Sequence, residues 1–113
     1  MNNIIIAKTF KKDFKKIFKI EADLSKFAIK LRKSKLLNLE KPFTKYKFSF
    51  NLIEIRGVLI FETEKFYIPI FVVKKSDKKY GMNLVISNEI KNILEAKYEK
   101  IKSDIENDNF QIY

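Results

Sequence analysis

The sequence predicts an α+β fold in which helices pack on one side of an antiparallel sheet of about four strands. Apolar residues recur at helical spacing in the first third of the chain and again towards its end, whereas the middle alternates or runs continuously apolar, as strands do. The expected element order is β-α-α-β-β-β-α, with a helical hairpin packed on the sheet and a C-terminal helix. At 113 residues the chain is expected to form a single domain covering residues 1–113.

The N-terminal part is expected to form one strand and a basic helical hairpin. Ile4–Ile6 makes the strand, and Thr9 is a candidate N-cap for the first helix. The second helix is expected from about Asp23 to Leu37. Both helices carry an apolar stripe, formed by Phe10, Phe14, Ile17 and Phe18 in the first and by Leu24, Phe27, Ala28 and Leu31 in the second. Lysines occupy the opposite faces, so the apolar faces are expected to point at the sheet.

The middle of the chain is expected to form the strands Lys47–Ile55, Val58–Phe61 and Phe66–Val73. Gly57 predicts a bulge or a turn, and Glu62–Lys65 predicts a hairpin turn. Pro69 predicts a bulge or an unpaired edge position inside the last of these strands. Ser87 is then a candidate N-cap for a helix whose apolar stripe runs from Ile90 to Ile105. The C-terminal residues 110–113 are expected to form either a final short strand or a loose tail.

The composition excludes several kinds of chemistry. The chain has no cysteine and no histidine, which removes disulfides, thiolate or imidazole metal ligands and the usual general base. No metal and no small-molecule cofactor are expected. No apolar run approaches the roughly 18 residues of a membrane span, and the first residues lack the basic segment of a signal peptide. A cytoplasmic protein without membrane contact is therefore expected.

The positive charge lies in the first half of the chain. Residues 1–50 contain 14 Lys and Arg against 4 Asp and Glu, whereas residues 51–113 contain 10 of each. A surface of this kind attracts polyanions such as nucleic acid, an acidic protein segment or anionic lipid. The alternative is a lysine coat that only keeps the protein soluble.

The densest local motif is Lys74–Asn83, which holds four lysines, a tyrosine and an asparagine directly after an apolar strand. Arg56 lies within another apolar strand, Ile53–Ile60. A guanidinium held rigidly on a strand presents a two-pronged donor to phosphate. A cationic loop beside it indicates a site that holds a phosphodiester, and these residues alone leave open whether the site also cleaves one.

These residues in this order resemble the RelE/ParE superfamily of small toxins from bacterial type II toxin–antitoxin pairs, and most of all its RelE and HigB branches. Leu52–Arg56 resembles the strand that places an arginine in the site of those toxins. Phe71–Lys79 resembles their strand ending in a Lys-Lys-x-x-Lys loop, and Ile90–Ile101 resembles the helix that follows. The resemblance implies a ribosome-dependent mRNA endonuclease (an mRNA interferase) that arrests translation. Its implied partners are a cognate antitoxin protein, the ribosome and mRNA.

RNA cleavage of this kind requires a base for the ribose 2′-hydroxyl, cations beside the phosphorane and a proton for the leaving oxygen. The expected catalytic residues of this metal-independent endoribonuclease are Arg56, Lys75, Lys78 and Tyr80. A lysine crowded by the other lysines of residues 74–79 is the expected base, because like charges lower the pKa of an ammonium group. The expected RNA-binding residues are Lys74, Lys79 and Asn83 in the loop and Lys12, Lys16, Lys30 and Lys33 on the helical hairpin.

Most of these side chains have a structural alternative. Arg56 is also consistent with a salt bridge to Glu54 or to a helix carboxylate, and Tyr80 with packing over the sheet edge. Asn83 also suits a turn, and the loop lysines also suit a solvated surface. Asp77 is expected to pin the loop rather than to act as a base.

Two other functions remain open from the sequence. One is a ParE-like toxin of similar fold that binds a protein target without nuclease activity, in which case the loop lysines should tolerate substitution. The other is a non-toxic basic RNA-binding module.

Overall fold

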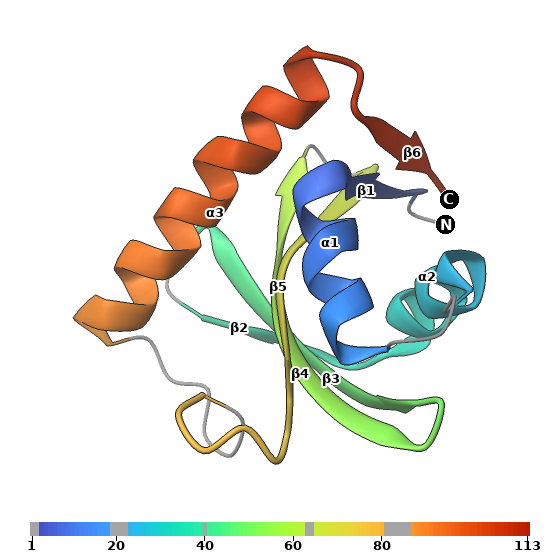
Figure 1. Ribbon diagram of the computed structural model, residues 1–113, viewed down its shortest axis with the longest axis vertical. Coiled ribbons are helices and arrows are strands. Elements are labelled where there is room, and N and C mark those ends of the chain that lie inside the picture. The colour runs from blue at the N-terminus through green and yellow to red at the C-terminus, as the bar shows by residue number, and fades with distance from the viewer. Residues whose placement is uncertain (1–2, 19–22, 40, 63–64, 81–86) are drawn as a thin grey trace.

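The computed structural model describes residues 3–18, 23–39, 41–62, 65–80 and 87–113, which form a six-stranded sheet and three helices (Figure 1). The elements in chain order are β1 (Asn3–Ala7), α1 (Lys8–Ile17), α2 (Leu24–Lys33), β2 (Leu36–Asn38), β3 (Phe43–Phe50), β4 (Ile53–Glu62), β5 (Phe66–Lys74), α3 (Asn88–Glu106) and β6 (Phe110–Ile112). The strand order across the sheet is β2-β3-β4-β5-β1-β6.

The predicted α+β class is confirmed, whereas the prediction of about four antiparallel strands is wrong. The sheet is mixed, because β1 pairs in parallel with β5 while the other pairs are antiparallel. The additional strands β2 and β6 have three residues each. Strands this short have no alternation to recognise, and they form because a neighbouring strand offers its backbone hydrogen-bonding groups. The predicted second helix consequently ends at Lys33 instead of continuing to Leu37.

Helix α2 packs on β3 and helix α1 packs on β5, and an aromatic core joins both helices to one face of the sheet. Phe27 of α2 contacts the rings of Tyr46, Phe48 and Phe50, which alternate along β3. Phe14 of α1 also reaches Phe50, with ring centroids 5.9 Å apart. Aromatic pairs at these separations contribute about 0.5–1.5 kcal/mol each beyond the area they bury. The basic helical hairpin therefore packs its apolar side on the sheet and leaves its lysines outside.

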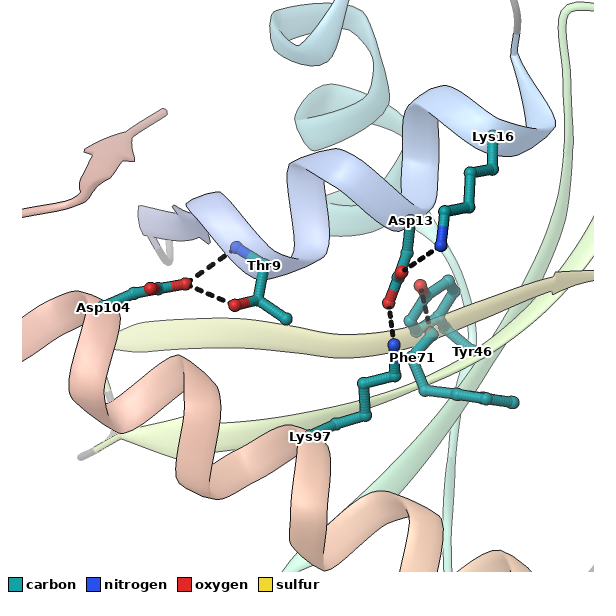
Figure 2. A network of polar contacts seen from close by, with 7 residues as sticks. All are labelled: Thr9, Asp13, Lys16, Tyr46, Phe71, Lys97 and Asp104. Atoms are coloured by element: carbon teal, nitrogen blue, oxygen red, sulfur yellow. Dashed lines mark hydrogen bonds and ion pairs between the residues drawn. The ribbon is translucent and has the colours of Figure 1, made fainter.

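The ends of the helices agree only partly with their predicted caps. Ser87 caps α3 as predicted, because its Oγ accepts a hydrogen bond from the Ile90 N–H at 3.2 Å. Helix α1 instead has Ala7 as its N-cap, without a side-chain cap bond. Thr9 lies inside the helix, where its N–H and hydroxyl both donate to Asp104 of α3 at 2.7 Å (Figure 2).

The hairpin between β3 and β4 turns at Asn51 and Leu52, which both have positive φ angles (49° and 66°). The predicted strand Lys47–Ile55 is therefore wrong, because it runs across this turn. Gly57 forms neither a bulge nor a turn. It lies inside β4 directly opposite Tyr46, and a Cβ added there would lie 2.2 Å from the Tyr46 ring and 2.4 Å from the Phe71 carbonyl oxygen. A glycine is needed at this position so that the tyrosine ring can lie against the backbone.

Strand β5 contains the predicted irregularity at Pro69. Its register with β4 shifts between Val58 and Leu59, which pair with Phe71 and Pro69, so that Ile70 is the extra residue. The hairpin between β4 and β5 is also present, since Glu62 pairs with Phe66. The two residues at its tip lie outside the described ranges.

The C-terminal segment ties the two ends of the chain together. Helix α3 packs against β5, α1 and β1, and in Figure 1 it lies on the opposite side of β4 and β5 from α2. Lys97 of α3 forms an ion pair with Asp13 of α1 (Figure 2). Strand β6, one of the two predicted alternatives for residues 110–113, pairs with β1. Within the described ranges, none of the helices is long and apolar enough to cross a membrane.

Candidate nucleic-acid interface

The register of the sheet brings three cationic side chains together on one face. Lys47 of β3 lies directly opposite Arg56 of β4, and Lys45 lies two residues away on the same face of β3. On the neighbouring β5, Val73 pairs with Arg56, and Phe71 lies in the row of Lys45. Residues directly opposite in an antiparallel pair have Cβ atoms about 5 Å apart. Lys45, Lys47 and Arg56 therefore form one compact group, which we call the sheet cluster.

The environment of Lys45 lowers the pKa of its side chain. Partial burial lowers the pKa of its ammonium group, and the positive charges of Arg56 and Lys47 lower this pKa further. A lysine with a lowered pKa is neutral more often, and only neutral lysine can accept a proton. Lys45 is thus a candidate base.

The sheet cluster has no ion-pair partner among the described residues, although Glu54 lies on the same face two residues from Arg56. No carboxylate of the described ranges lies within ion-pair distance of Lys45, Lys47 or Arg56. Glu54, the salt-bridge partner considered for Arg56, instead lies 3.3 Å from Lys75. Like charges directly opposite each other destabilise a sheet. An anion that enters from outside the protein would relieve this repulsion.

Arg56 is held in place by its own strand. Its side chain is half-buried, and Nη1 donates a hydrogen bond to the Ile55 carbonyl oxygen at 3.0 Å. A guanidinium carries five N–H donors in a fixed planar arrangement. One donor therefore fixes the side chain, and others remain for a phosphate oxygen.

Residues 75–80 form an ordered turn beside the sheet cluster. The side chain of Asp77 accepts hydrogen bonds from the N–H groups of Lys79 and Tyr80, at 2.9 Å each. The Asp77 N–H in turn donates to the Lys74 carbonyl oxygen at 3.0 Å. The prediction that Asp77 pins this loop is confirmed. The Tyr80 ring lies edge-on against Phe71, with centroids 6.1 Å apart, which is the packing alternative considered for it.

Glu89 of α3 connects this turn to the helix. One of its carboxylate oxygens lies 2.7 Å from the Lys79 ammonium group and 3.0 Å from the Tyr80 hydroxyl, which donates to it. The hydrogen bond to Glu89 raises the pKa of Lys79, with a further contribution from Tyr80. The expectation that crowding lowers the pKa of the loop lysines is therefore wrong for Lys79, because a carboxylate lies closer to it than another cation.

The other loop residues lie in different surroundings. Lys75 lies on the face of the sheet cluster, bonded to Glu54, whereas Lys74 pairs with Ile55 and points to the opposite face. Lys78 is exposed. Lys74 lines an open pocket of about 370 Å³ between α1, the edge of β5 and α3. Asn83 lies outside the described residues.

The lysines of the helical hairpin form a second basic surface. Lys12 and Lys16 lie exposed on α1 and Lys33 lies exposed on α2, while Lys30 donates to the Ser49 carbonyl oxygen at 2.8 Å. Both helices pack on the face that carries Tyr46, and the sheet cluster occupies the other face. The cationic residues expected to bind RNA are thus divided between two sides of the sheet.

Lys45 and Lys47 were not predicted as part of the site. The signal for them is the alternation of Lys45 and Lys47 with Tyr46, Phe48 and Phe50 in one strand, which places both lysines on the face away from the aromatic core. Their position opposite Arg56 depends on where the hairpin turns, and an apolar residue at that turn conceals it.

No protein-family model, curated protein or solved structure matches this chain.

Proposed function

We propose that the chain is a toxin of the RelE/HigB type that cleaves mRNA on the ribosome and is neutralised by a cognate antitoxin protein. The observation that carries this proposal is the sheet cluster, three cations without an acidic partner in the described chain, adjoining a turn that presents Tyr80. A partly exposed group of cations suits a phosphodiester better than a structural role, because its members repel one another and have no ion-pair partner in the described chain.

In the proposed reaction the neutral amine of Lys45 takes the proton of a ribose 2′-hydroxyl. The 2′-oxygen then attacks the adjacent phosphorus, and the bond from phosphorus to the 5′-oxygen of the next nucleotide breaks. Arg56 and Lys47 stabilise the extra negative charge on the phosphorane, a contribution that reaches several kcal/mol in preorganised sites. The products are a 2′,3′-cyclic phosphate and a 5′-hydroxyl end, so neither water nor an oxidant is consumed.

The leaving 5′-oxygen needs a proton, and Tyr80 is the proposed donor. Its ring is anchored on Phe71, in the β5 row that Lys45 shares. Lys75 and Lys78 supply positive charge at the rim of the site, where Lys75 is already paired with Glu54. General acid and base groups of this kind each contribute roughly 10² to 10⁴ in rate.

The surface of the helical hairpin serves a different purpose in this proposal. Its lysines lie on the far side of the sheet from the sheet cluster, so they bind the phosphate backbone of ribosomal RNA rather than the scissile bond. Such contacts add affinity without sequence preference.

The test is induced expression in a bacterial host, with mapping of the 5′ ends of abundant mRNAs. Expression of the wild type should arrest growth and produce new 5′ ends inside translated frames, and Arg56→Ala should abolish both. Lys41→Ala is a matched control, because Lys41 is an exposed cation in the loop before β3. It should behave like the wild type.

Growth arrest with intact mRNA would contradict the nuclease proposal and favour a toxin that binds a protein target. A chain that causes no arrest would favour the non-toxic binding module.

A further inference from the structure

Lys79 and Tyr80 direct two hydrogen-bond donors at one acceptor atom. The Lys79 ammonium group and the Tyr80 hydroxyl both contact the same oxygen of Glu89, at 2.7 and 3.0 Å. The Lys79 ammonium group also lies 5.4 Å from the centre of the Tyr80 ring. A phosphate oxygen accepts the same kind of charge-assisted hydrogen bond from these groups as a carboxylate oxygen does.

The shape of the turn does not depend on Glu89. Asp77 holds the backbone of Lys79 and Tyr80, and Phe71 holds the Tyr80 ring. Glu89 itself is fixed to the first turn of α3, where Ser87 caps the helix. The Tyr80 ring would therefore stay in place if the carboxylate moved away, and the Lys79 ammonium group would keep its contact with that ring. A donor that is already positioned binds a new acceptor at lower entropic cost.

The ion pair between Lys79 and Glu89 is exposed enough for another anion to replace the carboxylate. The side chains of Lys79 and Glu89 are 65% and 57% exposed. Exposed ion pairs are weak, because water competes for both charges. The hydrogen bond to Lys79 lowers the pKa of Glu89, so the carboxylate stays charged at neutral pH and keeps the donors occupied.

We propose that Glu89 is an intramolecular substitute for phosphate, and that the oxygen position it fills between Lys79 and Tyr80 is a binding position for an RNA phosphodiester. RNA would displace the carboxylate when it binds, which frees the Tyr80 hydroxyl for the substrate. This inference rests on the proposed function for its ligand, and it makes Glu89 a competitor that weakens RNA binding. A purely structural Glu89 would have the opposite effect, because its loss would loosen the turn.

The test compares Glu89→Gln with Glu99→Gln. Glu99 is a close chemical match on the same helix, since it pairs with Lys102 at 2.9 Å and Lys102 lies 4.8 Å from the centre of the Tyr98 ring. Both substitutions remove one negative charge and one surface ion pair. Binding of a 2′-O-methyl RNA oligonucleotide, which cannot be cleaved, is measured by fluorescence anisotropy. Glu89→Gln should tighten binding about threefold more than Glu99→Gln, which is the size expected for one exposed competing ion pair.

A second arm uses Lys79→Ala in each background. In Glu89→Gln this change should remove most of the gain. In the wild type it should lower RNA affinity by a smaller factor, because there the ammonium group must give up its contact with Glu89 before it can bind RNA. Equal affinities for Glu89→Gln and Glu99→Gln, or weaker binding by Glu89→Gln, would overturn the proposal.

A third arm separates this inference from the nuclease proposal. Inorganic phosphate is titrated into both variants, and the amide resonances of Lys79 and Tyr80 are followed by NMR. Half-saturation at a lower phosphate concentration in Glu89→Gln than in Glu99→Gln would support the exchange of the Glu89 carboxylate for phosphate. If at the same time no variant binds RNA, only the nuclease proposal is contradicted. The same phosphate dependence in both variants would overturn the exchange.

Discussion

The single residue on which the proposed chemistry depends most is Lys45. Its pKa is lowered because it is partly buried and lies beside Arg56 and Lys47. Replacing either neighbour with an acid would oppose this lowering, because a nearby negative charge favours the charged ammonium form. In the proposed mechanism, the three charges of the sheet cluster attract a phosphodiester, and two of them also favour the neutral form of Lys45 that accepts a proton.

Replacing Lys45 with arginine should separate binding from catalysis. Arginine keeps the positive charge but is not deprotonated in proteins, so it cannot act as a base. We expect Lys45→Arg to keep its RNA affinity and to lose at least about 100-fold in single-turnover cleavage rate, the lower end of the range for a lost general base. Lys47→Arg, the neighbouring control, should keep most of the rate. Cleavage by Lys45→Arg at the wild-type rate would remove Lys45 from the mechanism.

Tyr46 makes the free energy of unfolding depend on pH in the alkaline range. Its hydroxyl is fully buried and donates to the Phe71 carbonyl oxygen at 2.9 Å. Burial raises its pKa well above the ordinary value of about 10. Above that pH the unfolded chain releases this proton while the folded protein retains it. The stabilising contribution is therefore complete below about pH 10 and decreases as the pH rises further.

Tyr46→Phe should remove this dependence. Urea unfolding between pH 8 and pH 11 should show a smaller fall in the free energy of unfolding for Tyr46→Phe than for the wild type. The difference in slope should approach about 1.4 kcal/mol per pH unit, which corresponds to one proton. Tyr98→Phe, at a half-buried position on α3, should follow the wild-type curve. Parallel curves for Tyr46→Phe and the wild type would contradict the assignment.

At the scale of elements, the hairpin of β3 and β4 determines the site, because its turn fixes which lysine lies opposite Arg56. A shift of the register by one residue would move Lys45 and Lys47 to the other face of the sheet. The turn itself is strained, since Leu52 has a φ of 66°. Its side chain is fully exposed and makes no compensating packing contact. A residue with a Cβ atom loses roughly 1–2 kcal/mol in this left-handed conformation.

Leu52→Gly should therefore stabilise the protein by about 1 kcal/mol, after allowance for the greater freedom of glycine in the unfolded chain. No packing is lost, because the side chain is exposed. The free energy of unfolding in urea measures this gain. Leu52→Ala is the control, since alanine also carries a Cβ atom and should stabilise little. An equal gain for alanine and glycine would show that the exposed side chain, and not the backbone angle, is the source of the instability.

Helix α1 carries a row of lysines along one side. Lys8, Lys12 and Lys16 follow one another at intervals of four residues, and no acidic side chain lies in its first turn. Neighbouring like charges at this spacing destabilise a helix by about 0.2–0.5 kcal/mol per pair. Asp13 lies 3.8 Å from the Lys16 ammonium group and compensates part of this charge. In the proposed function, ribosomal RNA compensates the rest.

The double variant Lys12→Ala and Lys16→Ala should weaken RNA binding modestly and make it less sensitive to salt. The slope of log affinity against log salt concentration should fall in magnitude by about 1.4, at roughly 0.7 for each lost contact to a single strand. Binding titrations between 50 and 200 mM salt measure this slope. Lys100→Ala, on the less basic surface of α3, is the control. An unchanged slope in the double variant would exclude α1 from the interface.

At the scale of the whole molecule, the N-terminal and C-terminal segments of the chain are joined to each other. Strand β6 pairs with β1, and α3 is bonded to α1 through Thr9–Asp104 and Asp13–Lys97 (Figure 2). The same helix carries Glu89 to the turn beside the sheet cluster. The packing of α3 therefore links the N-terminal hairpin, the sheet and the proposed site into one unit.

The helices could be predicted from the sequence because their apolar stripes are long enough to show a period. The bulge at Pro69 and the cap at Ser87 follow from local chemistry that acts within a few residues. The sheet cluster could not be predicted in the same way. Its assembly depends on a turn at Asn51 and Leu52, and leucine at a positive φ is a residue that turn preferences disfavour. The contact of Glu89 with Lys79 depends on tertiary packing, which local patterns do not encode.

The most direct measurement of the central claim is cleavage of a defined mRNA in purified, programmed ribosomes, with chemical analysis of the new ends. The wild type should produce 2′,3′-cyclic phosphate and 5′-hydroxyl ends, and Arg56→Ala should leave the mRNA intact. Intact mRNA with the wild-type protein, or equal cleavage by Arg56→Ala, would contradict the claim that the sheet cluster is a site of RNA cleavage.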